Sequence, residues 1–422
     1  MKNVYDVLVE RGFIEQVSNE AGVRAVVEEP ITCYIGFDPS ASSFHVGNLV
    51  PIMALAHMQH HGHRPITIVG GGTGMIGDPS GKTEMRKMLT REQIEANVQA
   101  QKTQLACYLD FEGGKALILN NADWLTKLNY IEFLRDIGRH FSVNRMLAAE
   151  AYRVRLETGL SFIEFNYMLL QAYDFLHLYR EYGCVLQMGG SDQWGNILAG
   201  VDLTRRVEGA TVYASVFPLI TTSSGAKMGK TEAGAVWLDR ERVSPYEYYQ
   251  FWINTEDPDV ERFLALFTFL PMDRVKELGR LQGADLREAK EVLAYEATKI
   301  THGEEEARKA QEDSRRLFAT FTVDAVIEPR PFDGGKMAQE GVPTTAVAAE
   351  ELAAGIPVTE LFHQVGLCGS RGSARRLIEQ GGAYVNGERV ASIDVLVTDK
   401  DLMEGAILLR AGKKRHHRVI LS

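Results

Sequence analysis

The sequence predicts an α/β chain: a parallel sheet with crossover helices, then a helical region, then a small third unit. The first two hundred residues alternate short apolar runs with amphipathic stretches, which is typical of parallel strands joined by helices. From about residue 244 to 317 the sequence is rich in Glu, Arg, Ala and Leu and loses strand-like alternation, which favours helices. A length of 422 residues fits two or three domains.

The composition is that of a folded chain with a sizeable core, because 45% of the residues are hydrophobic and 24% are charged. It excludes a disordered protein, a collagen-like fibre and a small disulfide scaffold. No apolar run approaches the ~20 residues that a membrane-spanning helix needs, and acidic residues near the N-terminus are atypical of a signal peptide. Four widely spaced cysteines (Cys33, Cys107, Cys184 and Cys368) predict a reducing, cytoplasmic location.

Local patterns predict the individual elements in order. Buried strands are expected where short apolar runs occur, at residues 31–37, 65–69 and 184–188. A helix is expected over residues 45–61, ended by Gly62, and a longer one over about 161–182. Residues 318–350 lose this regularity and collect prolines and glycines, which indicates a linker.

The third unit begins near Gly355 and is the basic part of the molecule. The chain has 46 basic and 56 acidic side chains, but residues 355–422 hold ten basic and seven acidic ones. A helix is expected from Ser370, followed by a hairpin that turns at Asn386-Gly387, a favoured two-residue turn. A polyanion would bind this end of the chain, although so small an excess of basic over acidic side chains is equally consistent with ordinary variation along a sequence.

A glycine cluster follows the second predicted strand. Gly72, Gly74 and Gly77 fit a dinucleotide-binding pattern, but Pro79 would then fall early inside the helix that the pattern requires. The next segment resembles a phosphate-binding loop with one residue too few between its glycines. What remains is a tight turn at the carboxyl end of a strand, carrying Asp78, which is where open α/β sheets bind ligands. A purely structural turn is the alternative.

Other polar residues follow the predicted strands. His45 starts a helix, where an imidazole can donate to a phosphate oxygen, and Gly47 leaves room for a flat base. Asp192 follows the third strand and suits a ribose hydroxyl. Lys227 and Lys230 lie in a glycine-flanked loop and could reach a polyphosphate. Taken singly, each of these residues could equally be an ordinary surface residue.

One polar face stands out on an otherwise apolar helix. Tyr167, Gln171 and Asp174 are spaced i, i+4 and i+7 and therefore share a face of the helix over 161–182. Buried polar groups need partners, and a ligand with an amine and a hydroxyl could supply them. A polar stripe that faces solvent is the alternative.

Taken together and in this order, these motifs resemble the class I aminoacyl-tRNA synthetases, and within them the bacterial tyrosyl-tRNA synthetases. His45-Val46-Gly47-Asn48 is similar to the HIGH motif of that class, with Asn48 in place of its second histidine. Residues 227–231 (KMGKT) are similar to the KMSKS loop. The segment 189–196 (GGSDQWGN) and the polar helix face resemble the tyrosine-specific members.

The resemblance implies a domain order and an activity. It implies a Rossmann-like catalytic domain over residues 1–232, an α-helical domain on the tRNA anticodon side over 233–325, a linker over 326–354 and an S4-like RNA-binding domain over 355–422. The activity would be ligation: L-tyrosine and ATP form tyrosyl-adenylate and pyrophosphate, and the tyrosine then passes to the 3′ end of tRNA(Tyr) in protein biosynthesis. The implied assembly is a cytoplasmic homodimer, formed through residues 124–146, with no membrane or DNA partner. Mg²⁺ would accompany the ATP, and the sequence offers no dedicated metal site.

The resemblance also implies roles for single residues. Tyr34 and Asp174 would bind the phenolic hydroxyl of tyrosine, and Asp78, Tyr167 and Gln171 its ammonium group. The ATP and adenylate site would comprise Gly36, Asp38, Ser40, His45, Gly47, Asn48, Gly190, Asp192, Gln193 and Lys230. Catalysis would involve His45, Lys82, Arg86, Lys227 and Lys230 around the phosphates. RNA contacts would come from Arg371, Arg375, Arg376, Lys413, Lys414 and Arg415.

Two alternatives remain open on the sequence. One is an NAD-dependent dehydrogenase built on the glycine turn at residues 72–77. The other is an RNA-binding regulator that uses the basic tail without catalysis.

Overall fold

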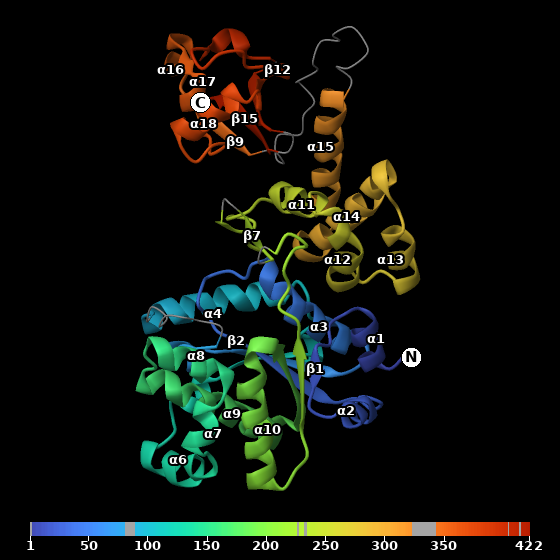
Figure 1. Cartoon of the computed structure of the whole chain (residues 1–422), viewed down its shortest axis with the longest axis vertical. Coiled ribbons are helices and arrows are strands. Elements are labelled where there is room, and N and C mark those ends of the chain that lie inside the picture. The colour runs from blue at the N-terminus through green and yellow to red at the C-terminus, as the bar shows by residue number, and fades with distance from the viewer. Residues whose placement is uncertain are drawn as a thin grey trace. The chain divides into compact units, whose positions relative to one another are not determined.

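The computed structural model describes most of the chain, which divides into two compact units (Figure 1). Unit 1 comprises residues 1–239 and 256–281, and unit 2 comprises residues 240–255 and 282–422. The described residues are 2–80, 89–225, 228–231, 234–322, 343–403, 405–412 and 415–422, without the side chains of residues 151, 230, 231 and 317–322. No helix in these ranges is both long and apolar enough to span a bilayer.

Unit 1 is built on a six-stranded sheet in the order β1-β6-β5-β2-β3-β4. Its strands are β1 Gln16–Val17, β2 Thr32–Phe37, β3 Arg64–Val69, β4 Leu117–Asn120, β5 Cys184–Gly190 and β6 Tyr213–Phe217. All neighbours run parallel except β1, which is antiparallel to β6. The three predicted strands are confirmed as β2, β3 and β5. The strand order reverses between β2 and β5, and ligands bind at such switch points in open α/β sheets.

Helices pack on this sheet and complete its core. The main ones are α1 Val4–Glu10, α2 Glu20–Val26, α3 Leu49–His60, α4 Arg91–Leu105, α9 Phe162–Tyr182 and α10 Trp194–Glu208. Short helices precede α9: α5 Ala122–Leu125, α6 Tyr130–Asp136, α7 Val143–Leu147 and α8 Glu150–Thr158. Tyr34 and Ile66 from the strands and Phe175 from α9 meet in one buried cluster. The predicted helix over about 161–182 is thus confirmed, and it packs on the sheet through its apolar side chains.

The predicted helix over residues 45–61 begins later than expected. His45 has an extended backbone and forms an isolated bridge with Trp237. A 3-10 turn follows over Val46–Asn48, and only then does α3 run to His60. Gly62, at a φ of 88°, ends the helix as predicted. His45 is therefore the capping residue in front of the turn and not part of the first helical turn.

Residues 256–281 pack in unit 1, although their helical pattern suggested the helical domain. They form α12 Val260–Phe267 and α13 Met272–Gly279, and α12 packs on α3. The guanidinium of Arg11, which caps the end of α1, donates to the carbonyls of Ala265 (2.8 Å) and Thr268 (3.0 Å). Helical periodicity identifies the element but not its packing partner, so the predicted boundary at residue 233 does not hold for this stretch.

Unit 2 contains a helical part and a C-terminal sheet. The helical part consists of α11 Pro245–Ile253, α14 Leu286–His302 and α15 Glu304–Thr322, which pack on one another. The C-terminal sheet has the order β12-β11-β14-β15-β9. Its strands are β9 Thr344–Val347, β11 Ala383–Val385, β12 Glu388–Arg389, β14 Ala406–Ala411 and β15 Arg415–Leu421, with helices α16 Ala349–Ala354, α17 Val358–Gln364 and α18 Arg371–Glu379.

The C-terminal sheet confirms the predicted hairpin and moves the predicted boundary. Asn386 (φ 50°) and Gly387 (φ 88°) join β11 to β12 in left-handed conformations, as the favoured two-residue turn requires. Ser370 caps α18, which agrees with the predicted helix start. However, β9 pairs in parallel with β15. Residues 344–354, predicted to be linker, therefore belong to the C-terminal fold.

Candidate active site

A cavity of about 410 Å³ lies in unit 1, at the carboxyl ends of β2 and β5. It occupies the switch point of the sheet, where the topology places a ligand site. Segments far apart in the sequence contribute to its lining. The predicted site residues that line it are Tyr34, Gly36, Asp38, Ser40, His45, Asn48, Asp78, Tyr167, Gln171, Asp174, Gly190 and Gln193.

One end of the cavity is closed by Tyr34 and Asp174, both buried. The Tyr34 hydroxyl has no hydrogen-bond partner among the described residues. Asp174 is held by two donors: Asn121 Nδ2 reaches Oδ2 at 2.9 Å, and Trp124 Nε1 reaches Oδ1 at 2.8 Å. Burial nevertheless raises the pKa of Asp174 to about 7, because the two hydrogen bonds only partly offset the loss of solvation. Burial also raises the pKa of Tyr34 well above its usual value.

Asn121 and Trp124, which hold Asp174, are candidate site residues that the sequence analysis missed. Asn121 directly follows β4, so the parallel sheet brings it to the same edge as the other strand ends. Its side chain also accepts from the backbone N–H of Gly72 at 2.8 Å, which fixes the glycine turn. The polar pair Asn120-Asn121 after the apolar run over 116–119 was the available signal.

A relay of hydrogen bonds runs along the cavity from Asp174. Asn121 Nδ2 also donates to Thr73 Oγ1 (3.1 Å), and Thr73 Oγ1 donates to Asp38 Oδ1 (3.0 Å). The Tyr167 hydroxyl donates to Asp38 Oδ2 at 3.2 Å. The relay joins side chains from the ends of β2, β3 and β4 to α9, so it holds the strand ends and the helix in one fixed arrangement.

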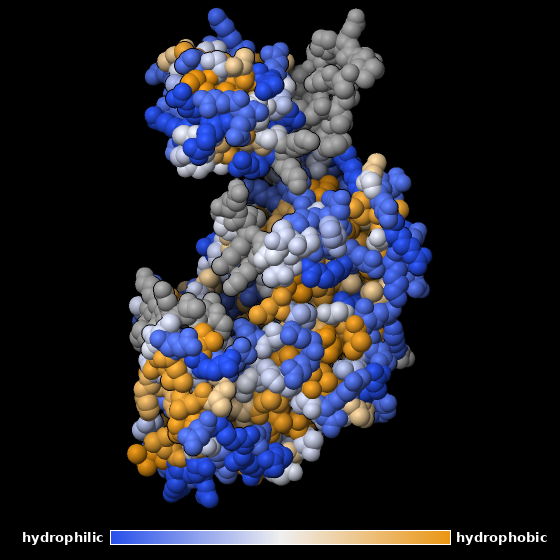
Figure 2. Space-filling view, viewed as in Figure 1, coloured by the Kyte–Doolittle hydropathy of each residue, from blue (hydrophilic) through white to orange (hydrophobic). Residues whose placement is uncertain are grey.

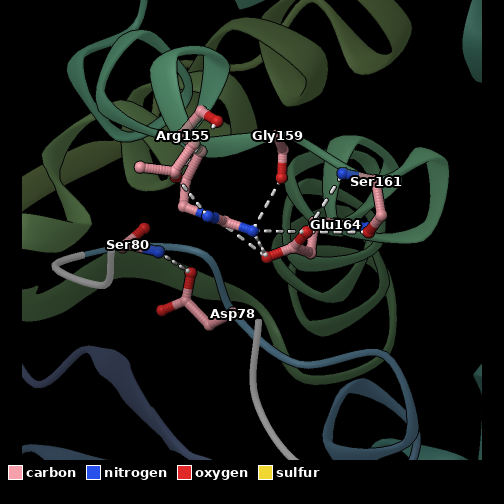
Figure 3. A network of polar contacts seen from close by, with 7 residues as sticks. Asp78, Ser80, Arg155, Gly159, Ser161 and Glu164 are labelled. Atoms are coloured by element: carbon pink, nitrogen blue, oxygen red, sulfur yellow. Dashed lines mark hydrogen bonds and ion pairs between the residues drawn. The ribbon is translucent and has the colours of Figure 1, made fainter. Parts of the chain in front are cut away.

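A second group surrounds Asp78. Gln193 Nε2 donates to Asp78 Oδ2 at 2.6 Å. The backbone N–H of Ser80 donates to Asp78 Oδ1 at 2.9 Å (Figure 3). Asn196 in turn donates to Ser80 Oγ at 3.2 Å. Nearby on the lining, Gln171 Oε1 is buried and has no partner in the described part of the chain. A carboxylate beside an unpartnered amide oxygen is suited to a cationic ligand group, because both are acceptors.

His45 and Asn48, which also line the cavity, form a closed turn. The backbone N–H of Gly47 donates to His45 Nδ1 at 3.0 Å, and Asn48 Oδ1 accepts from the His45 backbone N–H at 3.0 Å. Because Nδ1 accepts, the proton of the neutral imidazole lies on Nε2, which can donate to a phosphate oxygen. Asn48, which stands where the HIGH motif has its second histidine, thus stabilises the turn.

The lack of a side chain at Gly47 serves a different purpose from the one predicted. A Cβ there would lie 3.1 Å from the carbonyl oxygen of Met228, and a Cβ on Gly229 would lie 2.7 Å from the backbone nitrogen of Gly47. The two glycines let the backbone at Met228 and Gly229 pack directly against the His45 turn. Gly47 itself does not line the cavity, and neither does Asp192, which lies in the 3-10 turn Ser191–Gln193.

Several predicted residues cannot be placed in the site. Lys82, Arg86 and Lys227 lie outside the described residues. For Lys230 only the backbone is described, in β7 (Lys230–Thr231). Within the described ranges, no three His, Cys, Asp or Glu side chains gather as a candidate metal site.

The glycine turn does not continue as a dinucleotide-binding helix. Gly72 precedes a 3-10 turn over Thr73–Met75, and Gly77 has a φ of 88°. Residues 76–80 are not helical. The dehydrogenase alternative requires a helix that starts at this point, and the described residues do not form one.

The predicted RNA-contacting arginines lie on the C-terminal fold. Arg371 and Arg375 belong to α18 and pair with Glu360 and Glu379 respectively. Arg376 and Arg415 are exposed. Lys413 and Lys414 lie outside the described residues.

Comparisons with known proteins identify the family. A family model described as class I tRNA synthetases (W and Y) matches residues 27–319, and one for the SYY-like C-terminal domain of tyrosine–tRNA ligases matches residues 336–419. The tyrosine–tRNA ligase of Desulfosudis oleivorans is 60% identical over 99% of both chains. That of Syntrophus aciditrophicus is 59% identical over 99% of this chain and 98% of the relative.

Solved structures show the same likeness. A C-terminally truncated mitochondrial tyrosyl-tRNA synthetase of Aspergillus nidulans superposes with a TM-score of 0.68 and 32% identity, over 75% of this chain and 95% of the other. The corresponding protein of Coccidioides posadasii gives 0.66 and 30%, over 74% and 92%. The sheet order, the cavity at its switch point and the full-length identity lead to one conclusion: the chain belongs to the tyrosine–tRNA ligases, a family of class I tRNA synthetases.

Proposed function

We propose that the unit 1 cavity is where this chain, an aminoacyl-tRNA ligase, joins L-tyrosine to ATP before passing the tyrosine to tRNA(Tyr). One observation carries the assignment of the substrate end: among the described residues the Tyr34 hydroxyl is buried without a partner, and the buried Asp174 lines the same cavity. A buried hydroxyl without a partner is costly, and the phenol of a tyrosine substrate would satisfy it.

The phenol subsite uses both residues. A carboxylate has about four acceptor positions, and Asn121 and Trp124 occupy one on each oxygen of Asp174. The phenolic O–H can therefore donate to Asp174 while its oxygen accepts from Tyr34. Phenylalanine would leave Asp174 with its bonds from Asn121 and Trp124, and the group that it would leave unsatisfied is the Tyr34 hydroxyl.

The ammonium group would lie at the Asp78 end. Asp78 Oδ1 and Oδ2 face one backbone and one side-chain donor, and Gln171 Oε1 remains available as an acceptor. The Tyr167 hydroxyl, which donates to Asp38, also lines the cavity and would contribute its oxygen. The substrate carboxylate then points away from α9, toward the side of the cavity that His45 lines.

The nucleotide would occupy that side. Gly36 leaves room for close approach, and Asp38, Ser40, Gly190 and Gln193 line the space. The tyrosine carboxylate attacks the α-phosphorus of ATP, the bond to pyrophosphate breaks, and tyrosyl-adenylate forms with no covalent link to the enzyme. The protein contributes orientation and charge stabilisation, with His45 Nε2–H directed at the leaving phosphates.

Basic side chains and a metal ion complete the proposal. Lys82, Arg86, Lys227 and Lys230 would surround the triphosphate, and Asp192 would bind the ribose. Mg²⁺ would arrive with the ATP and neutralise phosphate charge. In the second step, the terminal ribose hydroxyl of the tRNA attacks the carbonyl carbon of the adenylate, and AMP leaves. The exposed arginines of the C-terminal fold support its part in binding the tRNA.

We also propose a cytoplasmic homodimer. The stretch over residues 124–146 exposes large apolar side chains, among them Tyr130 (59% exposed), Ile131 (69%) and Val143 (56%). Apolar residues gather over α6, α7 and α8 on the face shown in Figure 2. Exposed patches of this kind are typical of protein–protein interfaces. Ile131→Asp should give a monomer in sedimentation analysis, and a dimer that survives this change would place the interface elsewhere.

The four free cysteines support a reducing compartment.

The test of the main proposal is pyrophosphate exchange with each of the twenty amino acids. Only tyrosine should support exchange of label between pyrophosphate and ATP. Exchange that depends on another amino acid would overturn the assignment of the phenol subsite. RNA binding without any exchange would favour the non-catalytic alternative.

A further inference from the structure

A buried ion pair lies next to the proposed tyrosine site, outside the cavity lining. Arg155 in α8 and Glu164 in α9 have side chains that are each only 3% exposed. Arg155 Nε donates to Glu164 Oε1 at 3.2 Å, and a terminal guanidinium nitrogen donates to Oε2 at 3.1 Å (Figure 3). The pair is bidentate, a geometry that fixes both side chains closely.

The remaining polar atoms of the pair fasten the turn between the two helices. Arg155 donates to the carbonyl of Gly159 (2.9 Å) and to Thr158 Oγ1 (2.6 Å). Glu164 Oε2 accepts from both the backbone N–H (3.1 Å) and the hydroxyl (2.7 Å) of Ser161, the residue that caps α9. The start of α9 is thus held by side-chain hydrogen bonds and not by apolar packing alone.

Tyr152, also in α8, holds α9 one turn further on. Its hydroxyl donates to the carbonyl of Phe165 at 2.9 Å and accepts from the backbone N–H of Met168 at 3.2 Å. These two groups lie on either side of Tyr167 in the sequence. Burial raises the pKa of the Tyr152 hydroxyl, and the negative charge of Asp78 raises it further. Asp78 is therefore close enough to Tyr152 in α8 to interact with it electrostatically.

Glu164 shares a helix face with the proposed substrate residues. Glu164, Tyr167, Gln171 and Asp174 follow one another at three- and four-residue intervals, so they form one stripe along α9. The tips of helical side chains lie about 5–6 Å from the axis, so rotating the helix by about 10° moves each tip by about 1 Å. A misplacement of about 1 Å costs on the order of 10²-fold in rate.

We propose that Arg155 and Glu164 are positioning residues for tyrosine: they set the rotation of α9 and thereby the places of Tyr167, Gln171 and Asp174. This rests on the proposed roles of those three side chains. A purely stabilising role explains the pair poorly, since well-packed apolar residues of similar size usually replace a buried ion pair without loss of stability. What apolar residues cannot reproduce is the set of hydrogen bonds to Thr158, Gly159 and Ser161.

The test variant is Arg155→Met/Glu164→Leu, which removes both charges together and leaves neither one buried alone. We expect it to fold, with a KM for tyrosine in pyrophosphate exchange at least about tenfold above wild type and an unchanged KM for ATP. The matched control, Arg153→Met/Glu157→Gln, removes two charges from exposed positions of the same helix and should leave both constants unchanged.

A folded double variant with the wild-type KM for tyrosine overturns the inference. If the double variant does not fold, Arg155→Lys decides, because it keeps the charge and loses the bidentate geometry. It should raise the KM for tyrosine alone, and equal changes in both KM values would indicate a general loss of structure and overturn the positioning role. If wild type itself shows no tyrosine-dependent exchange, the proposed function fails, and the two failures are thereby distinguishable.

Discussion

Tyr34→Phe should affect stability and tyrosine binding in opposite directions. The Tyr34 ring packs edge-on against Phe175, with centroids 5.4 Å apart, and phenylalanine can keep this contact. Without ligand, the Tyr34 hydroxyl is buried and has no partner within the described residues. A polar group in that state costs about 1–3 kcal/mol, so removing it should stabilise the free enzyme by about 1 kcal/mol and raise its Tm.

The same change removes a hydrogen bond to the substrate. A neutral hydrogen bond contributes a net 0.5–1.5 kcal/mol or so, which corresponds to a KM for tyrosine about 2- to 10-fold higher. Phenylalanine cannot satisfy the wild-type hydroxyl, but this penalty is absent in the variant. Discrimination between tyrosine and phenylalanine should therefore fall by a similar factor.

The assay combines thermal unfolding of the free enzyme with pyrophosphate exchange on both amino acids. Tyr5→Phe is a suitable control, because Tyr5 is buried in α1 and does not line the cavity. It should leave both KM values unchanged. A Tm below wild type together with an unchanged KM for tyrosine in Tyr34→Phe would refute the assignment of this hydroxyl to the substrate.

Four further outcomes are expected. Since the pKa of Asp174 is about 7, its ionised fraction rises about tenfold from pH 6 to pH 8, and the KM for tyrosine should fall accordingly. Asp174→Asn should weaken tyrosine binding and abolish the pH dependence of this KM. The raised pKa also means that the folded state favours protonated Asp174, so the stability that this group contributes is lost as the pH rises from about 4 through 7. At pH 8, Asp174→Asn should therefore have a higher Tm than wild type. A lower Tm for this variant would contradict the argument that burial raises the pKa. Lys230→Ala should chiefly slow adenylate formation in pre-steady-state measurements, and a wild-type rate would exclude the loop from catalysis. Removing residues 336–422 should spare exchange and weaken tRNA charging, and equal charging would remove the C-terminal fold from tRNA binding.

The choice of where to cut in this deletion shows where sequence patterns mislead. The sequence alone suggests a cut at residue 355, but β9 (Thr344–Val347) pairs with β15. A cut at residue 355 would leave a strand without its partner. Such pairing joins residues more than seventy positions apart and leaves no local signal. The same reason explains why 256–281 was assigned to the wrong unit, since its contacts are with α1 and α3.

Elements with strong local patterns were predictable. The strands β2, β3 and β5 are short apolar runs, α9 combines a capping box at Ser161 with an apolar face, and Asn386-Gly387 specifies its turn almost alone. Polar side chains at strand ends were also predictable as a group, because parallel strands bring their carboxyl ends to one edge. Their hydrogen bonds to one another were not, because these depend on the lateral order of the strands.

Asp174 illustrates the consequence for function. The pattern of α9 places it on a polar face, but its state is set by Asn121 and Trp124, which reach it from the segment after β4. Two donors hold this carboxylate before any substrate arrives, so binding tyrosine need not reorient it. The Tyr34 hydroxyl, by contrast, has no partner among the described residues. In the proposed site, tyrosine would therefore gain a hydrogen bond to Tyr34 that phenylalanine cannot make, in addition to the bond that its phenol donates to Asp174.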